Sequence, residues 1–276
     1  MVNRPISGNS GHALNYARTP TRNTARITVA LRPRTAPELI DAAASLVRLT
    51  YGRLITIGAL AYLPIALVRV LGLRPTGGAE VTGVDLFLIV YDLVWQSLGW
   101  AAMLVVLAQQ YLTRRADLPV AIRSVHEDVW RITVISVACS LLTLVGLVLF
   151  ILPGLYFMVR FFAVPQTLLF ERTTMHEALI RSLWLSRHDQ LRLAVASAIT
   201  VAIGLATWAG TGAAVRPLVP AEWHVDLIAG VAQLFIQPFI AAVWLLFYYD
   251  IRMRVEGFDV QRGLETMSDA GDHGTR

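Results

Sequence analysis

The sequence has little charge and a single cysteine, and both shortages exclude classes of protein. Charged residues make up 16% of the 276 residues and hydrophobic residues 55%, which is far from the composition of an ordinary soluble domain. Cys139 lies within an apolar run, so an intramolecular disulfide and a cysteine metal cluster are both excluded. Residues 1–30 lack the apolar core of a cleaved signal peptide, and we expect them to form a disordered cytoplasmic tail.

Sequence patterns for catalysis and for metal or cofactor binding are also missing. There is no glycine-rich phosphate loop and no Gly-x-Ser-x-Gly nucleophile motif. None of the six histidines lies at metal-ligand spacing from another histidine, a cysteine or a carboxylate cluster. These histidines are His12, His126, His176, His188, His224 and His273. We therefore expect a protein that is not an enzyme and that holds no metal and no cofactor.

What the chain does have is six long apolar runs. A helix needs roughly 20 apolar residues to cross a bilayer, and six segments come close to that length. They are 54–73, 86–112, 132–152, 155–170, 193–215 and 227–249. Pro153 and Gly154 separate the third run from the fourth and predict a tight turn between antiparallel helices. The sequence therefore predicts an all-α integral membrane protein built as a six-helix bundle.

All 24 basic residues are arginine, and their positions predict the orientation of the chain. Eight precede residue 54, and four lie in each of the stretches 111–131, 171–192 and 249–276. Because arginine-rich loops resist translocation, this bias predicts a membrane protein with both termini in the cytoplasm. The net charge of +5 is then explained by topology and anionic lipid headgroups, and we expect no nucleic-acid partner.

Three cytoplasmic segments have the periodicity of amphipathic helices. The first begins at Thr35 with a capping box to Glu38, the second covers 118–129, and the third begins at Thr174 with a capping box to Glu177. Such helices either lie at the membrane surface, where arginine contacts anionic lipid, or pack beneath the bundle. The same periodicity fits both alternatives, so the sequence leaves them open.

Four stretches resemble a known family of membrane proteins. They are LRPRTAPELIDAA at 31–43, LPGLYFMVRFFAVPQTLLFE at 152–171, EALIRSLWLSR at 177–187 and YYDIRMRVEGFDV at 248–260. They resemble the bacterial polytopic family named after the membrane domain of glycerophosphodiester phosphodiesterases. The resemblance covers about 31–261 and implies a free-standing membrane domain there, followed by a disordered tail at 262–276. Thr173 and His188 depart from it, because family members often carry glycine at those positions.

The family name implies no hydrolase activity for this chain. The named hydrolase carries a separate catalytic barrel with clustered histidine, glutamate and aspartate metal ligands, and this sequence has no room for such a domain. At the inner ends of the spans we expect structural roles for acidic residues. Asp250 should anchor the last span against Arg252 or Arg254, and Glu171 should pair with a neighbouring cytoplasmic arginine such as Arg172.

Three ionisable residues lie inside the apolar runs and are the candidate site. An arginine at the bilayer centre costs about 2.5 to 3.5 kcal/mol, so ionisable residues at such positions are functional candidates by default. Arg69, Asp92 and Arg160 could meet at one depth in the outer half of the bundle. They would form either an ion pair or triad that fixes helix register, or a site for an anionic headgroup or phosphate.

The sequence favours a non-catalytic membrane protein that binds or organises membrane lipids or partner proteins, or that associates with itself. The alternative is a transporter or permease for a small or amphipathic anion, with the arginines of the apolar runs as substrate contacts. Discontinuous helices help such proteins, and Pro64, Pro165 and Pro238 could each break a span.

Overall fold

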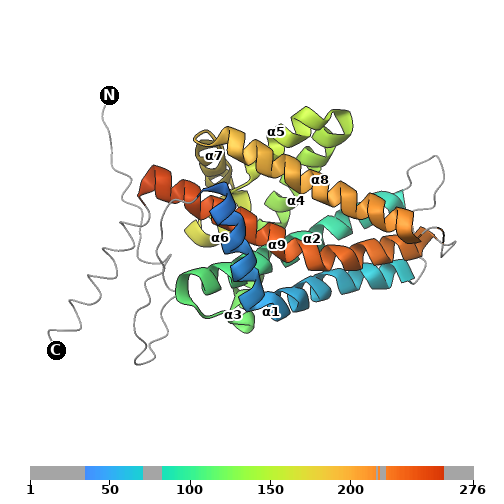
Figure 1. Ribbon diagram of the computed structural model, residues 1–276. Helices are drawn as coiled ribbons and strands as arrows, with labels where there is room; N and C mark the ends of the chain where they lie inside the picture. The colour runs from blue at the N-terminus through green and yellow to red at the C-terminus, as the bar shows by residue number, and fades with distance from the viewer. Residues whose placement is uncertain (1–34, 71–82, 216, 218–221, 258–276) are drawn as a thin grey trace.

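The computed structural model describes residues 35–70, 83–215, 217 and 222–257, and the described part is helical throughout its length apart from short connections (Figure 1). This confirms the all-α fold. The two tails predicted at 1–30 and 262–276 lie outside the described residues. The described helices are α1 Ala36–Val70, α2 Gly83–Thr113, α3 Leu118–Glu127, α4 Val129–Leu149, α5 Ile151–Phe161, α6 Val164–Glu171, α7 Met175–Ser186, α8 Gln190–Val215 and α9 Glu222–Glu256.

Five stretches within the described residues are long and apolar enough to cross a membrane. They are Leu86–Thr113, Val129–Leu149, Ile151–Glu171, Gln190–Val215 and Gly230–Glu256. They correspond to five of the six predicted runs and identify the chain as a multi-pass membrane protein. The remaining run, 54–73, begins in the second half of α1 and continues past the described part of the chain.

The segment that begins at Thr35 is not a separate surface helix. It forms the first turns of the 35-residue helix α1, which continues without a break into the first apolar run. The Thr35 backbone N–H donates to Glu38 Oε2 at 2.9 Å, so the predicted cap is present in part. Leu39, Ala43 and Leu46 are buried in the main core, and this packing excludes the surface-lying alternative for this segment.

The helices α4 and α5 form a hairpin, but its turn lies earlier than predicted. The extended residue is Phe150, with φ −157° and ψ 143°, whereas Pro153 and Gly154 lie in the first turn of α5. Proline is tolerated there because a helix leaves its first N–H groups unpaired. Gly154 is needed for close packing, since a Cβ at this position would lie 2.6 Å from the Leu147 backbone nitrogen on α4.

Of the three prolines expected to break spans, Pro165 does so. The span Ile151–Glu171 is interrupted between Phe161 and Val164, and Pro165 lies in the first turn of α6. Proline has no N–H to donate to the carbonyl four residues earlier, and its ring clashes with that carbonyl, so the helix kinks. Pro64 and Pro238 lie within the continuous helices α1 and α9.

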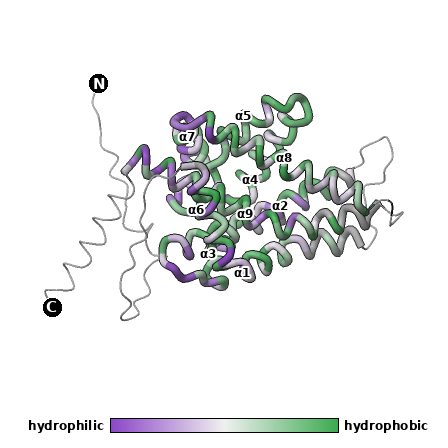
Figure 2. The backbone as a smooth tube through the Cα atoms, viewed as in Figure 1, coloured by the Kyte–Doolittle hydropathy of each residue, from purple (hydrophilic) through white to green (hydrophobic). Residues whose placement is uncertain are grey.

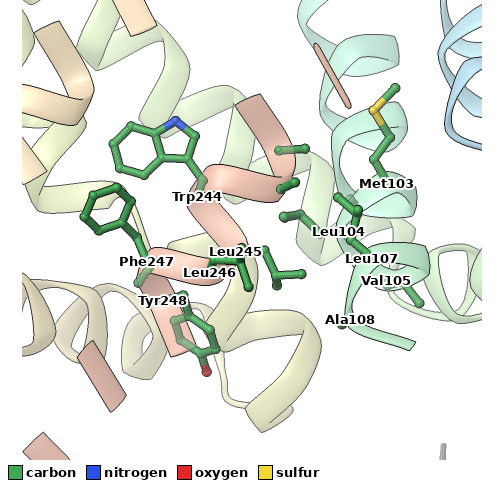
Figure 3. Close-up of a cluster of buried hydrophobic side chains, with 14 of the residues drawn as sticks. Met103, Leu104, Val105, Leu107, Ala108, Trp244, Leu245, Leu246, Phe247 and Tyr248 are labelled. Carbon is green, nitrogen blue, oxygen red and sulfur yellow. The ribbon is translucent and has the colours of Figure 1, made fainter. Parts of the chain in front are cut away.

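The core is centred on α2 and α9. Residues 101–108 of α2 are all buried, so neighbouring helices surround this part of α2 on every side. Figure 3 shows side chains of α2 and α9 from this core, with Trp244 and Phe247 directed away from α2. Lipid is as apolar as the core, and close approach between helices therefore contributes much of the stability of such packing.

Polar residues gather at one end of the bundle. Figure 2 shows hydrophilic positions at the start of α1, on α3, on α7 and at the end of α9, whereas the rest of the described bundle is mostly apolar. The start of α1 and the end of α9 lie at this same end in Figure 1. All three segments predicted to be amphipathic therefore belong to one end of the molecule.

Substitution of Gly99 tests how closely α1 and α2 approach each other. A Cβ at Gly99 would lie 2.6 Å from the Ala61 Cβ, so we expect Gly99→Ala to lower the free energy of unfolding by about 1 to 3 kcal/mol through overpacking. The matched control is Gly204→Ala on α8, where a Cβ meets nothing within 4 Å and helix propensity favours alanine. Denaturation in mixed micelles measures both, and equal effects would contradict the packing argument.

Candidate functional site

Arg160 lies in the last turn of α5, directly before the kink. Its Nε donates to the Tyr156 hydroxyl at 3.2 Å. Its Nη1 lies 3.3 Å from Ser186 Oγ and 3.4 Å from the Leu183 carbonyl oxygen, both on α7. The guanidinium carbon also lies 5.3 Å from the centre of the Tyr156 ring. The predicted site residue Arg160 is therefore held between α5 and α7.

The predicted triad is not assembled around Arg160. Asp92, on α2, accepts a hydrogen bond of 2.8 Å from Gln96 Nε2, and none of the hydrogen bonds of Arg160 within the described residues reaches Asp92. The Arg69 side chain lies outside the part of the molecule that the structure describes. Whether Arg69 meets Asp92 therefore stays a prediction.

Arg160 precedes the kink, and α5 is uninterrupted between the α4–α5 turn and this residue, so a regular helical rise applies up to Arg160. The chain changes direction only after it. Phe162 contacts Trp244 and Phe170 contacts Tyr248, with ring centroids 6.2 and 6.1 Å apart, so the chain after Arg160 runs obliquely to α9. The depth of Arg160 in the membrane stays a prediction.

Ser182 of α7 completes the backbone hydrogen bonding at the kink. Its hydroxyl donates to the Arg160 carbonyl oxygen at 2.7 Å and accepts the Ala163 N–H at 3.1 Å. Both groups would be satisfied within the helix if α5 continued unbroken into α6. Ser182 is fully buried, and unpaired backbone groups at this depth would be costly. The kink therefore fixes the position of α7 against α5 and α6.

The amphipathic segment at 174 onward is thus a packed helix. The capping box of Thr174 and Glu177 is complete, as predicted, with the Thr174 N–H 2.8 Å from Glu177 Oε2. Hydrogen bonds from the backbone and hydroxyl of Thr174 lower the pKa of the Glu177 carboxyl. Ser182 and Ser186 lie one turn apart on the buried face, and this pair of serines within an apolar face was a signal that the sequence analysis missed.

Arg160 differs from the other partly buried arginines in its partners. The described residues include five such arginines, and four of them form ion pairs with carboxylates. These pairs are Arg131 with Asp128, Arg181 with Glu171, Arg192 with Asp250 and Arg252 with Glu256. Arg160 has only hydroxyl and carbonyl partners within the described part of the chain. Its positive charge therefore has no carboxylate partner among the residues that the structure describes.

A second polar cluster joins α6, α7 and α9 at the same end of the bundle. Glu171 accepts a hydrogen bond from the Tyr248 hydroxyl at 2.7 Å and pairs with Arg181 at 3.0 Å. Glu256 pairs with Arg252 at 2.9 Å and also contacts Arg181. The expectation that a neighbouring arginine pairs with Glu171 is confirmed, and this arginine is Arg181 of α7.

Asp250 links α8 to α9. Its Oδ2 lies 2.9 Å from Arg254 Nε, which confirms one of the two predicted partners, and 3.0 Å from Arg192 Nη1 on α8. The Asp250 side chain is only 2% exposed, so these bonds are shielded from solvent. Asp189 lies 2.8 Å from the same Arg192 nitrogen. These groups neutralise one another and indicate a structural role.

The chemistry available at Arg160 is donation of hydrogen bonds to an anion. Nη2 of Arg160 is not engaged by the described residues, and the Tyr156 oxygen accepts from Nε, which leaves the phenol proton available to another acceptor. Guanidinium groups suit phosphate and carboxylate oxygens. Within the described ranges no group of three histidine, cysteine or acidic residues is placed to hold a metal.

Asp250 and Asp189 provide a matched test of the α8–α9 link, because both pair with Arg192. We expect Asp250→Asn to lower the free energy of unfolding by about 1 to 3 kcal/mol, since it removes the buried carboxylate that Arg192 and Arg254 share. Asp189→Asn removes a more exposed pair and should cost at most about 1 kcal/mol. Chemical denaturation in micelles measures both, and similar losses would show that burial of Asp250 contributes nothing.

Comparison of the chain with protein-family models, with curated proteins and with solved structures found no match. The family resemblance of the four sequence stretches therefore stays a prediction.

Proposed function

We propose that the chain is a six-span protein of the bacterial cytoplasmic membrane, with both termini in the cytoplasm, and that it binds or organises membrane lipids or partner proteins without catalysis. One observation carries this proposal. Within the most apolar stretch of α8 only 11% of the residues are buried, and within that of α4 only 17%, compared with 39% to 44% in the other three described spans. Two spans thus offer most of their apolar surface to molecules outside the chain.

The exposed side chains of these two spans are large and apolar. On α4 they include Leu144 and Val148, and on α8 they include Leu205 and Trp208, all between 44% and 77% exposed. Such surface is covered in the membrane by acyl chains or by helices of a partner. A protein whose main feature is this surface fits a lipid-organising or scaffolding role.

The second candidate is a transporter for a small or amphipathic anion. The kink at Pro165 favours it, because interrupted helices build substrate sites in many transporters and Arg160 lies beside this interruption. The two functions differ in a direct measurement. A transporter moves inorganic phosphate or an organic anion into proteoliposomes, whereas the proposed function predicts no flux above that of empty liposomes.

The lipid-organising function predicts a distinct lipid shell. We expect protein extracted with its surrounding bilayer by a styrene–maleic acid copolymer to be enriched in anionic phospholipids relative to the membrane of the same cells. The reason is the excess of arginine that the sequence places on one side of the apolar runs. Lipid mass spectrometry measures the enrichment, with an unrelated polytopic protein as the control. A shell identical to the control would contradict this function.

The orientation predicts which positions are reached from outside the cell. In a Cys139→Ser background, we expect a membrane-impermeant maleimide to label the Thr76→Cys variant in intact cells. It should label the Ser268→Cys variant only after permeabilisation, because the arginine-rich side stays in the cytoplasm. Labelling of the Ser268→Cys variant in intact cells would overturn the orientation.

A further inference from the structure

We propose that Arg160, positioned by Ser186 and joined by the hydroxyl group of Tyr156, binds the phosphate group of an anionic phospholipid where α5 contacts α7. This inference rests on the proposed lipid-binding function and adds a specific site to it. It depends on three observations: the charge of Arg160, the hydrogen-bond donors beside it, and the apolar surface around it.

The charge of Arg160 is the first observation. Each of the other partly buried arginines in the described part of the molecule has a carboxylate within 3.0 Å. Arg160 instead lies among neutral oxygens, at 3.2 to 3.4 Å, and these distances are at the long end for hydrogen bonds. An anion would therefore improve the surroundings of this guanidinium, whereas the other four sites are already neutral.

The donors beside Arg160 form the second observation. Arg160 Nε donates to the Tyr156 oxygen, so the Tyr156 O–H can donate to an incoming group. Nη2 offers further N–H groups from the same guanidinium. Ser182 holds the Arg160 backbone, and Ser186 holds Nη1, so the side chain is positioned before any ligand arrives. This arrangement of fixed donors suits an anion with several oxygens, as phosphate has.

The surrounding surface distinguishes a lipid from free phosphate. Tyr156 is 54% exposed, and α7 exposes Ile180 and Trp184 beside the residues that bond to Arg160. Leu191, near the start of α8, is 78% exposed. Exposed aromatic and aliphatic groups next to an arginine are typical of the interface between headgroups and acyl chains. A ligand with both a phosphate and acyl chains can use both kinds of contact.

The test is native mass spectrometry of the full chain in non-ionic detergent, titrated with phosphatidylglycerol or phosphatidylcholine. We expect the wild type to bind phosphatidylglycerol more tightly than phosphatidylcholine. Arg160→Gln should weaken phosphatidylglycerol binding about tenfold, because it removes charge-assisted hydrogen bonds. The matched control is Arg187→Gln, which removes the same charge from an exposed position on the C-cap of α7 and should change binding little.

Two further measurements separate the possible failures. If Arg160→Gln does not fold, Tyr156→Phe removes one exposed hydroxyl and should still weaken phosphatidylglycerol binding several-fold. Inorganic phosphate is the competitor, and we expect it to displace the lipid only at much higher concentration than the lipid itself. Displacement at equal concentration would assign the site to free phosphate and contradict the proposal that its ligand is a phospholipid.

These outcomes distinguish failure of the Arg160 site from failure of the lipid-organising function. Wild-type preference for phosphatidylglycerol that survives Arg160→Gln, or that falls equally with Arg187→Gln, overturns the Arg160 site and leaves the lipid-organising function standing. A wild type without any preference for the anionic lipid overturns both.

Discussion

The need to satisfy backbone hydrogen-bonding groups inside a membrane determines how this end of the bundle is built. Pro165 has no N–H, so the span Ile151–Glu171 cannot continue as a regular helix through that point. The Arg160 carbonyl and the Ala163 N–H both bond to one hydroxyl, that of Ser182. Because Ser182 belongs to α7, the hydrogen bonds that satisfy these two backbone groups also hold α7 against the kink. Through this kink, Pro165 determines where α7 packs, although α7 begins ten residues later in the chain.

Docking of α7 in turn determines the electrostatics of the polar end. Arg181 of α7 reaches Glu171 and Glu256, and Arg252 and Tyr248 complete the cluster from α9. Asp250 adds the link to α8 through Arg192. The partly buried charges of this cluster are tolerated because each has an opposite charge beside it. The helices α6 to α9 are therefore held at this end by ion pairs as well as by apolar packing.

Local features of this architecture could be predicted from the sequence, and features that depend on other helices could not. The capping box at Thr174, the anchoring of Asp250 by Arg254 and the break at Pro165 each depend on residues close in the chain. The turn between α4 and α5 was misplaced because Pro153 and Gly154 suit a turn and a first helical turn equally well. The continuity of α1 was missed because amphipathic periodicity alone does not show what covers the apolar face.

The partners of Arg160 differ from the expected ones for the same reason. Helical rise gives the position of a residue along its own helix but not which neighbouring helix its side chain meets. Asp92 was a candidate partner by that estimate, whereas the structure presents Arg160 to α7, whose contacting groups are Leu183 and Ser186. The identity of Arg160 as an unusual residue could be predicted, because its cost in lipid depends on its own chemistry.

The remaining question is what offsets the cost of the Arg160 charge. Three neutral hydrogen bonds contribute roughly 0.5 to 1.5 kcal/mol each, and the bonds of Arg160 are long, so their sum barely matches the roughly 2.5 to 3.5 kcal/mol cost of an arginine in the bilayer centre. A position nearer the headgroups lowers that cost, and Arg160 contacts α7, one of the helices with hydrophilic positions at the polar end. At the headgroups the nearest abundant counter-charge is lipid phosphate. The described partners of Arg160 on α5 and α7 are neutral, so its charge stays available to the phosphate that the membrane itself supplies.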